Sequence, residues 1–176
     1  MAEMRMANRP PDFRLRLAGR GTAGRLLQID SWIRSEIEAI SPFVDRLMPL
    51  VAGSHCVDGS EYEVELALRE AVSNAVIHGN RLDSRKLVHV RCRCSFGKGL
   101  CLTVTDEGQG FDAQAVLDLL ACENAEAEHG RGIQLMKAAM DKVFFERGGR
   151  EIHLHKKPAS ETKTEPRDIS QGLLRS

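Results

Sequence analysis

The 176 residues suffice for one domain with a substantial hydrophobic core and argue against a two-domain enzyme. Lysine and arginine together number 25, as do aspartate and glutamate, so the zero net charge excludes a general attraction to nucleic acid or acidic membranes. The N-terminus lacks the apolar core of a signal peptide, and no segment reaches the roughly 18 apolar residues that span a bilayer. We therefore expect a cytoplasmic protein without a direct nucleic-acid or membrane partner.

The two ends of the chain differ in composition from its middle. Residues 1–11 contain a proline pair and no apolar period, and residues 158–176 are polar and rich in turn formers. Both segments are predicted to be flexible, because neither can bury enough apolar surface to offset the entropy of ordering. Residues 12–157 are predicted to form the single folded domain.

The domain begins with two different hydrophobic patterns. Residues 13–17 alternate apolar and basic side chains, which predicts a short strand. Between residues 22 and 40, leucine and isoleucine recur at intervals of three and four, which predicts an amphipathic helix. The Ser41-Pro42 pair is predicted to interrupt it, with another short helix over residues 42–50 and a connection over residues 54–60.

A long helix is predicted to begin near Glu61. Ser60 is a plausible N-cap, and Glu63 three residues later completes a capping box. Gly79 or Asn80 is predicted to end the helix. The apolar residues at helical spacing are Val64, Leu68, Ala71, Val72, Ala75 and Val76.

The second half of the domain contains two predicted hairpins with a helix between them. Residues 87–95 and 100–105 alternate apolar and polar side chains around a glycine-rich turn. The remaining predicted elements are a loop or short helix from Gly110 to about Ala127, a helix with Ile133, Leu135, Met136 and Met140, and strands near 143–146 and 151–155. The order of elements predicts an α/β (α+β) two-layer sandwich, in which helices cover one face of a mainly antiparallel sheet.

The cysteines and the C-terminal histidine pair are expected to have ordinary structural roles. The cysteines are odd in number and lack a C-x-x-C pair, which predicts reduced thiols rather than a disulfide framework or a zinc ribbon. Cys92 and Cys94 follow a period of two and are predicted to pack in the core. His153 and His155 share a strand face, but without further ligands we assign them no role.

Three polar segments are candidates for a ligand site. Glu70, Asn74 and His78 are four apart and form one stripe on the predicted helix, a pattern that an ordinary solvated face also shows. Asp106 follows a strand and precedes two glycines, which permit positive φ and the close approach of a planar ligand. Two further glycines lie ahead of a predicted helix, whose N-terminal N–H groups favour phosphate. Their order along the chain predicts a nucleotide site.

These segments resemble motifs of the ATP-binding superfamily of DNA gyrase, heat-shock chaperones, sensor histidine kinases and mismatch-repair ATPases. E-x-x-x-N-x-x-x-H resembles the N box, D-x-G-x-G the first glycine box and G-R-G-I the second. Within the superfamily, the short chain, EAVSNAVIHGN and GRGIQLMKAAMDKV are most similar to the anti-sigma-factor serine/threonine kinases of bacterial partner-switching pathways. The resemblance covers roughly residues 12–157.

The resemblance implies a site for ATP and Mg²⁺. It implies that Asn74 coordinates Mg²⁺, that Glu70 is the general base, and that Asp106 accepts a hydrogen bond from the adenine amine. The other implied site residues are Gly108 and Gly110 beside the base, Gly130, Arg131, Gly132 and Ile133 at the hinge and start of the phosphate-holding helix, and His78 near the same face.

The resemblance also implies a function. A homodimeric kinase would bind a sigma factor and phosphorylate a serine or threonine on an anti-anti-sigma (STAS-type) antagonist. Two alternatives stay open: an ATP-gated binding switch without phosphate transfer, and a detached histidine-kinase catalytic domain. The sequence departs from the family pattern at Arg150, where many relatives have threonine after the glycine, and in the longer stretch over residues 41–60.

Overall fold

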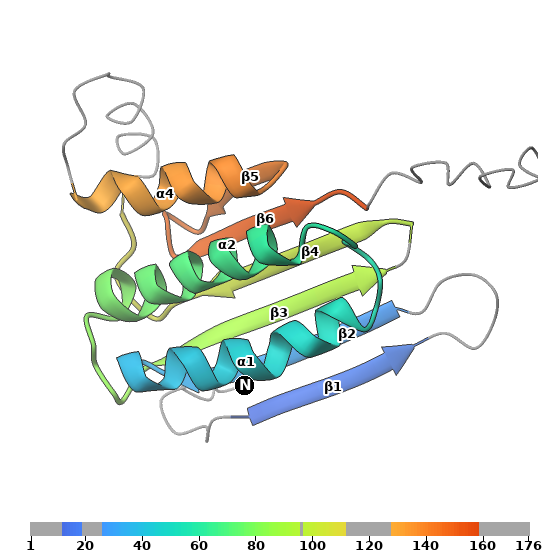
Figure 1. Cartoon of the computed structure of the whole chain (residues 1–176). Coiled ribbons are helices and arrows are strands. Elements are labelled where there is room, and N and C mark those ends of the chain that lie inside the picture. Colours follow the sequence, from blue (N-terminus) through green and yellow to red (C-terminus); the bar gives the residue numbers. More distant parts are fainter. Residues whose placement is uncertain (1–11, 19–25, 96, 112–127, 159–176) are drawn as a thin grey trace, which may run out of the picture.

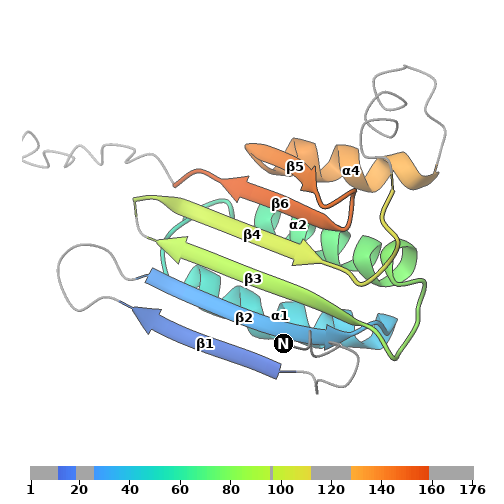
Figure 2. The ribbon, with the colours of Figure 1, turned by 180° about the vertical axis from the view of Figure 1, so that it is seen from behind.

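The computed structural model describes residues 12–18, 26–95, 97–111 and 128–158. Within these residues, a six-stranded sheet carries helices α1, α2 and α4 on one face and leaves its other face uncovered (Figures 1 and 2). The predicted two-layer sandwich is confirmed. The predictions for residues 1–11, for residues 112–127 and for the tail beyond Pro158 fall outside the described residues.

Every neighbouring pair of strands in the sheet is antiparallel. Both predicted hairpins are confirmed, and the second lies against the first because its last strand pairs with β4. In spatial order the strands are β1 (Asp12–Ala18), β2 (Leu26–Arg34), β3 (Leu87–Ser95), β4 (Gly99–Thr105), β6 (Glu151–Lys156) and β5 (Lys142–Glu146).

The helix predicted between residues 22 and 40 is wrong, because residues 26–34 form strand β2. Leu27, Ile29 and Ile33 are buried on the helix-covered side of the sheet. Isoleucines four residues apart fit both the period of a helix and the period of two of a strand, so their spacing alone does not distinguish a helix from a strand. Pairing with β1 on one side and β3 on the other determines the strand, and β-branched residues suit that environment.

Helix α1 (Ile40–Ala52) confirms the predicted short helix but begins earlier, after a 3₁₀ turn (Ile37–Ala39). Pro42 does not interrupt it. The proline lies in the first turn, where its missing N–H has no intrahelical acceptor. The apolar side of the helix packs onto the sheet through Val44 and Leu47, which are fully buried.

Helix α2 (Glu61–Asn74) begins as predicted, with Ser60 at the N-cap position. The predicted capping box is wrong, because the Ser60 side chain makes no capping hydrogen bond. A π-helical turn (Ala75–Gly79) continues the helix and ends at Asn80, as predicted. Such turns often mark functional sites, because the wider turn changes the direction of the side chains.

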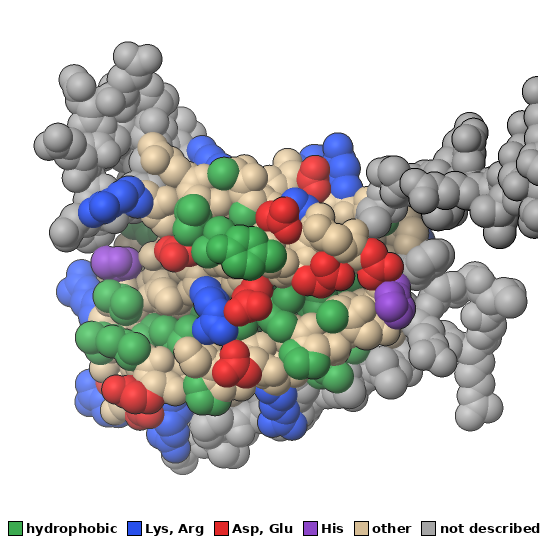
Figure 3. Space-filling model, in the orientation of Figure 1, with side chains coloured by type: hydrophobic (Ala, Val, Ile, Leu, Met, Phe, Trp, Pro, Cys, Tyr) green, Lys and Arg blue, Asp and Glu red, His purple; other side chains and the backbone are tan. Residues whose placement is uncertain are grey.

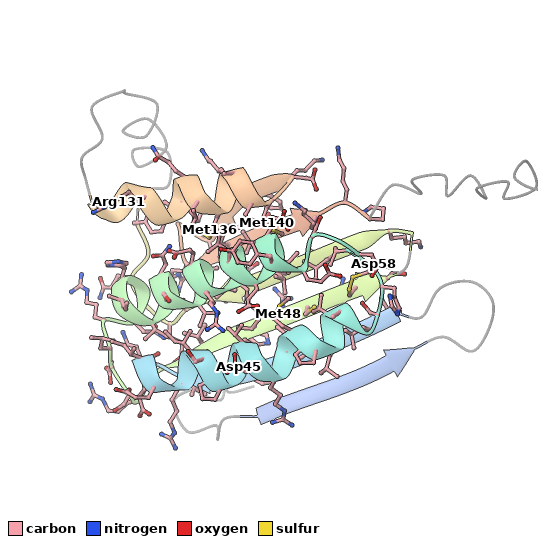
Figure 4. All side chains as sticks on the ribbon, viewed as in Figure 1. Asp45, Met48, Asp58, Arg131, Met136 and Met140 are labelled. Atoms are coloured by element: carbon pink, nitrogen blue, oxygen red, sulfur yellow. A yellow bond between two sulfur atoms is a disulfide. The ribbon has the colours of Figure 1, made fainter. Side chains whose placement is uncertain are left out.

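Helix α4 (Glu128–Ala139) lies beside α2 and completes the helical layer (Figure 1). Met136 and Met140 are buried and lie on the α2 side of α4 (Figure 4). The core therefore lies between three helices and the alternating inward residues of the sheet. Among the described residues, no helix is long and apolar enough to cross a bilayer.

The prediction of reduced cysteines is wrong for Cys56 and Cys94, which form a disulfide with a Cα–Cα distance of 5.8 Å. The bond links the connection after α1 to strand β3, and no spacing rule reveals a pairing 38 residues apart. Core packing of Cys92 and Cys94 is confirmed, since both are fully buried. Burial raises the pKa of the Cys92 thiol to about 12, so this cysteine stays protonated.

Asn80 anchors the end of the π-helical turn to the sheet. Its buried amide nitrogen donates to Ser35 Oγ at 2.6 Å and to the Leu87 carbonyl at 3.0 Å. Its side-chain oxygen accepts the Glu107 N–H at 2.8 Å. One side chain thus joins the helix end to the segments that end β2, begin β3 and follow β4.

Replacing Asn80 should therefore cost stability. We expect Asn80→Ala to lower the free energy of unfolding by about 2–3 kcal/mol, because three buried hydrogen bonds are lost together. Ser35→Ala removes only one of these partners and should cost about 1 kcal/mol. Urea unfolding measures both values. A loss below roughly 0.5 kcal/mol for Asn80→Ala would contradict the anchoring role.

Candidate nucleotide-binding site

A cavity of about 220 Å³ lies between α2, α4 and the neighbouring end of the sheet. Five of the predicted site residues line it: Asn74, His78, Asp106, Gly110 and Ile133. The rest of its lining is mostly apolar, with Ala71, Ala75, Val104 and Ile152 buried beneath it. A largely apolar cavity with a few polar groups is typical of small-molecule sites.

The polar stripe of α2 meets the second glycine segment. A Cβ atom on Gly132 would lie 2.8 Å from Glu70 Oε2 and 3.4 Å from Asn74 Nδ2, so only glycine fits there without displacement. Glu70 itself lies one turn before the cavity-lining Asn74, and His78 is exposed on the π-helical turn. The fold thus brings together residues 58 or more positions apart in the sequence.

Asp106 places a half-buried carboxylate at the cavity. Its Oδ1 accepts the Gly108 N–H at 2.7 Å, and its own N–H donates to the Arg150 carbonyl at 3.0 Å. A Cβ on Gly79 would lie 2.5 Å from the Asp106 carboxyl carbon, so the carboxylate packs directly on the backbone. Burial raises the pKa of Asp106, while the Gly108 N–H and the charges of Arg150 and Lys86 act in the opposite direction.

The glycines after Asp106 permit close backbone contacts. A Cβ on Gly108 would overlap the Gly79 carbonyl oxygen. Gly110 has a φ of +76°, and a Cβ there would overlap the Gly148 carbonyl oxygen, which accepts the Phe111 N–H at 2.9 Å. Both positions require glycine, because two backbone segments approach more closely than any side chain allows.

The second glycine segment differs from its prediction in position. Helix α4 begins at Glu128, so Gly130 and Gly132 lie within its first turns and not ahead of it. Ile133 is buried and lines the cavity, whereas Arg131 is exposed at the N-terminal end of α4 (Figure 4). Gly132, in the second turn of α4, lies beside Asn74, so the N-terminal half of the helix faces the polar stripe of α2. The first N–H groups of a helix favour phosphate.

Three residues that line the cavity were not predicted as site residues: Gly79, Phe111 and Phe145. Gly149 and Arg150, where the sequence departs from the family pattern, line it as well. Phe111 and Phe145 meet edge to face with ring centroids 5.3 Å apart, and a Cβ on Gly149 would lie 2.7 Å from the Phe111 ring. They provide an apolar wall suited to a planar ring. Phe111 could have been predicted as a site residue, because it directly follows the D-x-G-x-G segment in the sequence.

The contact between Gly79 and Asp106 predicts a selective effect on ligand binding. Gly79→Ala should weaken ATP affinity at least tenfold, because the added methyl group displaces the carboxylate. Gly53→Ala is the matched control, since its Cβ would contact only the end of its own helix. Calorimetric titration measures affinity, and circular dichroism checks folding. Equal affinity in the two variants would contradict this geometry.

Comparison with known proteins identifies the family of this chain. Residues 33–156 match the family model described as "Histidine kinase-like ATPase domain". The chain is 27% identical over 124 residues to the anti-sigma F factor of Clostridium novyi (strain NT), covering 68% of this chain and 81% of that one. It is 35% identical over 86 residues to the anti-sigma F factor of Geobacillus stearothermophilus, covering 48% of this chain and 58% of that one.

The anti-sigma F factor of Geobacillus kaustophilus (strain HTA426) matches with the same identity and coverage. The resemblance seen in the three sequence motifs is thereby confirmed. The family match covers α2, β4, α4, β5 and β6, the elements whose side chains line the cavity. This chain belongs to the histidine kinase-like ATPase domain family.

Proposed function

We propose that this chain is an ATP-binding serine/threonine protein kinase and anti-sigma factor. It sequesters a sigma factor and phosphorylates an anti-anti-sigma (STAS-type) antagonist. The observation that carries the proposal is the contact of Gly132 with Glu70 and Asn74 beside the cavity. The similarity to three anti-sigma F factors supports the sigma-factor partner.

The cavity suits the base of ATP. The Asp106 carboxylate accepts a hydrogen bond from the adenine amino group, and the apolar wall of Phe111 and Phe145 faces the ring. Asn74 offers the amide oxygen that hard cations prefer, with the Glu70 carboxylate beside it, so these residues fit Mg²⁺. When bound, Mg²⁺ neutralises charge on the phosphates.

The proposed reaction transfers the γ-phosphoryl group of ATP to a hydroxyl group of the antagonist. The hydroxyl oxygen forms a bond to the γ-phosphorus as the bond from that phosphorus to the β–γ bridging oxygen breaks, and ADP leaves. Glu70 takes the hydroxyl proton. Positioning dominates such reactions, and the close packing of Glu70 against α4 supplies it.

We also propose that the protein acts as a homodimer with protein partners. Among the described strands, β1 pairs only with β2 and β5 only with β6, so either of these edge strands could make a symmetric contact. The helix-covered face shows acidic, basic and apolar groups interspersed (Figure 3). Such a mixed surface suits protein partners better than the basic surface that nucleic acid requires.

Glu70→Gln tests the kinase assignment. The amide keeps the shape of the side chain but cannot take a proton, so ATP affinity should be retained while phosphate transfer falls at least a hundredfold. Asn74→Ala should weaken Mg²⁺-dependent binding and transfer together. Glu63→Gln, on the same helix but away from the cavity, is the matched control.

The assay uses radiolabelled ATP with STAS-type antagonist domains from the same genome, scored alongside ATP affinity. The proposal requires transfer by the wild type and by Glu63→Gln. If the wild type transfers no phosphate to an antagonist that it binds, the protein is an ATP-gated switch and the kinase assignment is wrong.

A further inference from the structure

The uncovered face of the sheet carries a second group of ionisable side chains, on β5 and β6 (Figure 2). Glu146 and Glu151 are directly opposite each other in the antiparallel register. His153 follows two residues after Glu151 and therefore points to the same face. Like charges placed opposite each other are destabilising, and Arg91 and Arg147 beside Glu151 offset part of this repulsion.

The three side chains have the spacing of metal ligands. His153 Nε2 lies 3.0 Å from Glu151 Oε1 and 3.3 Å from Glu146 Oε2, and all three atoms lie within 4.8 Å of one another. Zinc binds imidazole nitrogen and carboxylate oxygen at about 2.0–2.2 Å in a tetrahedron, which separates adjacent ligands by about 3.3 Å. The donors therefore need little rearrangement to share an ion.

Neighbouring groups fix the His153 ring in a suitable orientation. Its Nδ1 lies 3.3 Å from the hydroxyl oxygen of the buried Thr103, and the Phe144 ring stacks on it with centroids 4.6 Å apart. Without an ion, Nε2–H donates to Glu151 Oε1 at 3.0 Å. When an ion replaces that hydrogen, the proton moves to Nδ1, which can donate to Thr103, and the Nε2 lone pair faces the ion. Metal-binding histidines commonly have such a partner on their second nitrogen.

The two oxygens of Glu151 have different surroundings. Oε2 accepts the Thr105 hydroxyl at 2.9 Å and lies 3.5 Å from both Arg91 and Arg147. Oε1 faces His153 instead. The contacts of Oε2 thus hold the carboxylate in place, and Oε1 points toward the proposed ion. The positive charges of both arginines reduce the attraction of this carboxylate for a cation.

We propose that Glu146, Glu151 and His153 form a binding site for a divalent transition-metal ion, with zinc the best match. One nitrogen and two oxygen ligands leave a fourth position for water, which is typical of open zinc sites. The Glu146 side chain is 55% exposed, so the site is accessible to solvent. It is separate from the nucleotide cavity, whose lining includes none of these three residues.

Metal titration of the whole protein, without nucleotide and after treatment with a chelator, tests the proposal. Calorimetry with Zn²⁺ should give one ion per chain with micromolar affinity, and Co²⁺ should give visible absorption bands. His153→Ala and Glu146→Gln should each lower the affinity at least tenfold. Arg147→Gln should raise it severalfold, because a positive charge near Glu151 is removed.

The matched control is His55→Ala, which removes a histidine paired with a single aspartate at 3.1 Å on the exposed surface. It should leave metal affinity unchanged. Glu146→Gln changes an exposed side chain and should leave the protein folded, so it tests the site even if His153→Ala unfolds. Cys101 on β4 is an alternative ligand, because its Sγ lies 3.6 Å from His155 Nε2. Retained affinity in Glu146→Gln, loss of affinity only in Cys101→Ser, or no saturable binding by the wild type would each overturn the proposal.

Discussion

Backbone contacts at glycines determine the geometry of the nucleotide site. Gly79, at the end of the π-helical turn, touches both the Asp106 carboxylate and the backbone of Gly108. Gly132 brings α4 against Glu70 and Asn74 on the polar stripe of α2. A Cβ on Gly108 would overlap the Gly79 carbonyl, so that backbone contact requires glycine, whereas a Cβ on Gly79 or Gly132 would displace the Asp106 or Glu70 carboxylate from its position. The rest of the fold holds α2 where both contacts form.

The two faces of the sheet have different roles. The helix-covered face buries the core and opens into the cavity lined by Asn74 and Asp106. The uncovered face is polar, yet Trp32 and Glu151 are buried there by neighbouring side chains. Trp32 stacks on His89 with centroids 4.3 Å apart. That face therefore carries its own interactions, and the proposed metal site is one of them.

The sequence predicted the hairpins, the course of α2 and the location of the polar segments, because these depend on local period and turn residues. It misassigned β2, since isoleucines four apart fit two periods and only pairing with β1 and β3 decides between them. The Cys56–Cys94 bond, the glycine contacts and the neighbours of His153 join distant segments. No local pattern encodes such contacts.

Titration of ATP into the wild type and Asp106→Asn across pH tests the central claim most directly. The claim predicts weaker binding by the variant at neutral pH, because a charged acceptor for the adenine amine becomes a neutral amide. Burial raises the pKa of Asp106, so wild-type affinity should fall towards that of the variant as the pH decreases through this pKa. Equal affinities at every pH, with both proteins folded, would contradict the assignment of the base site.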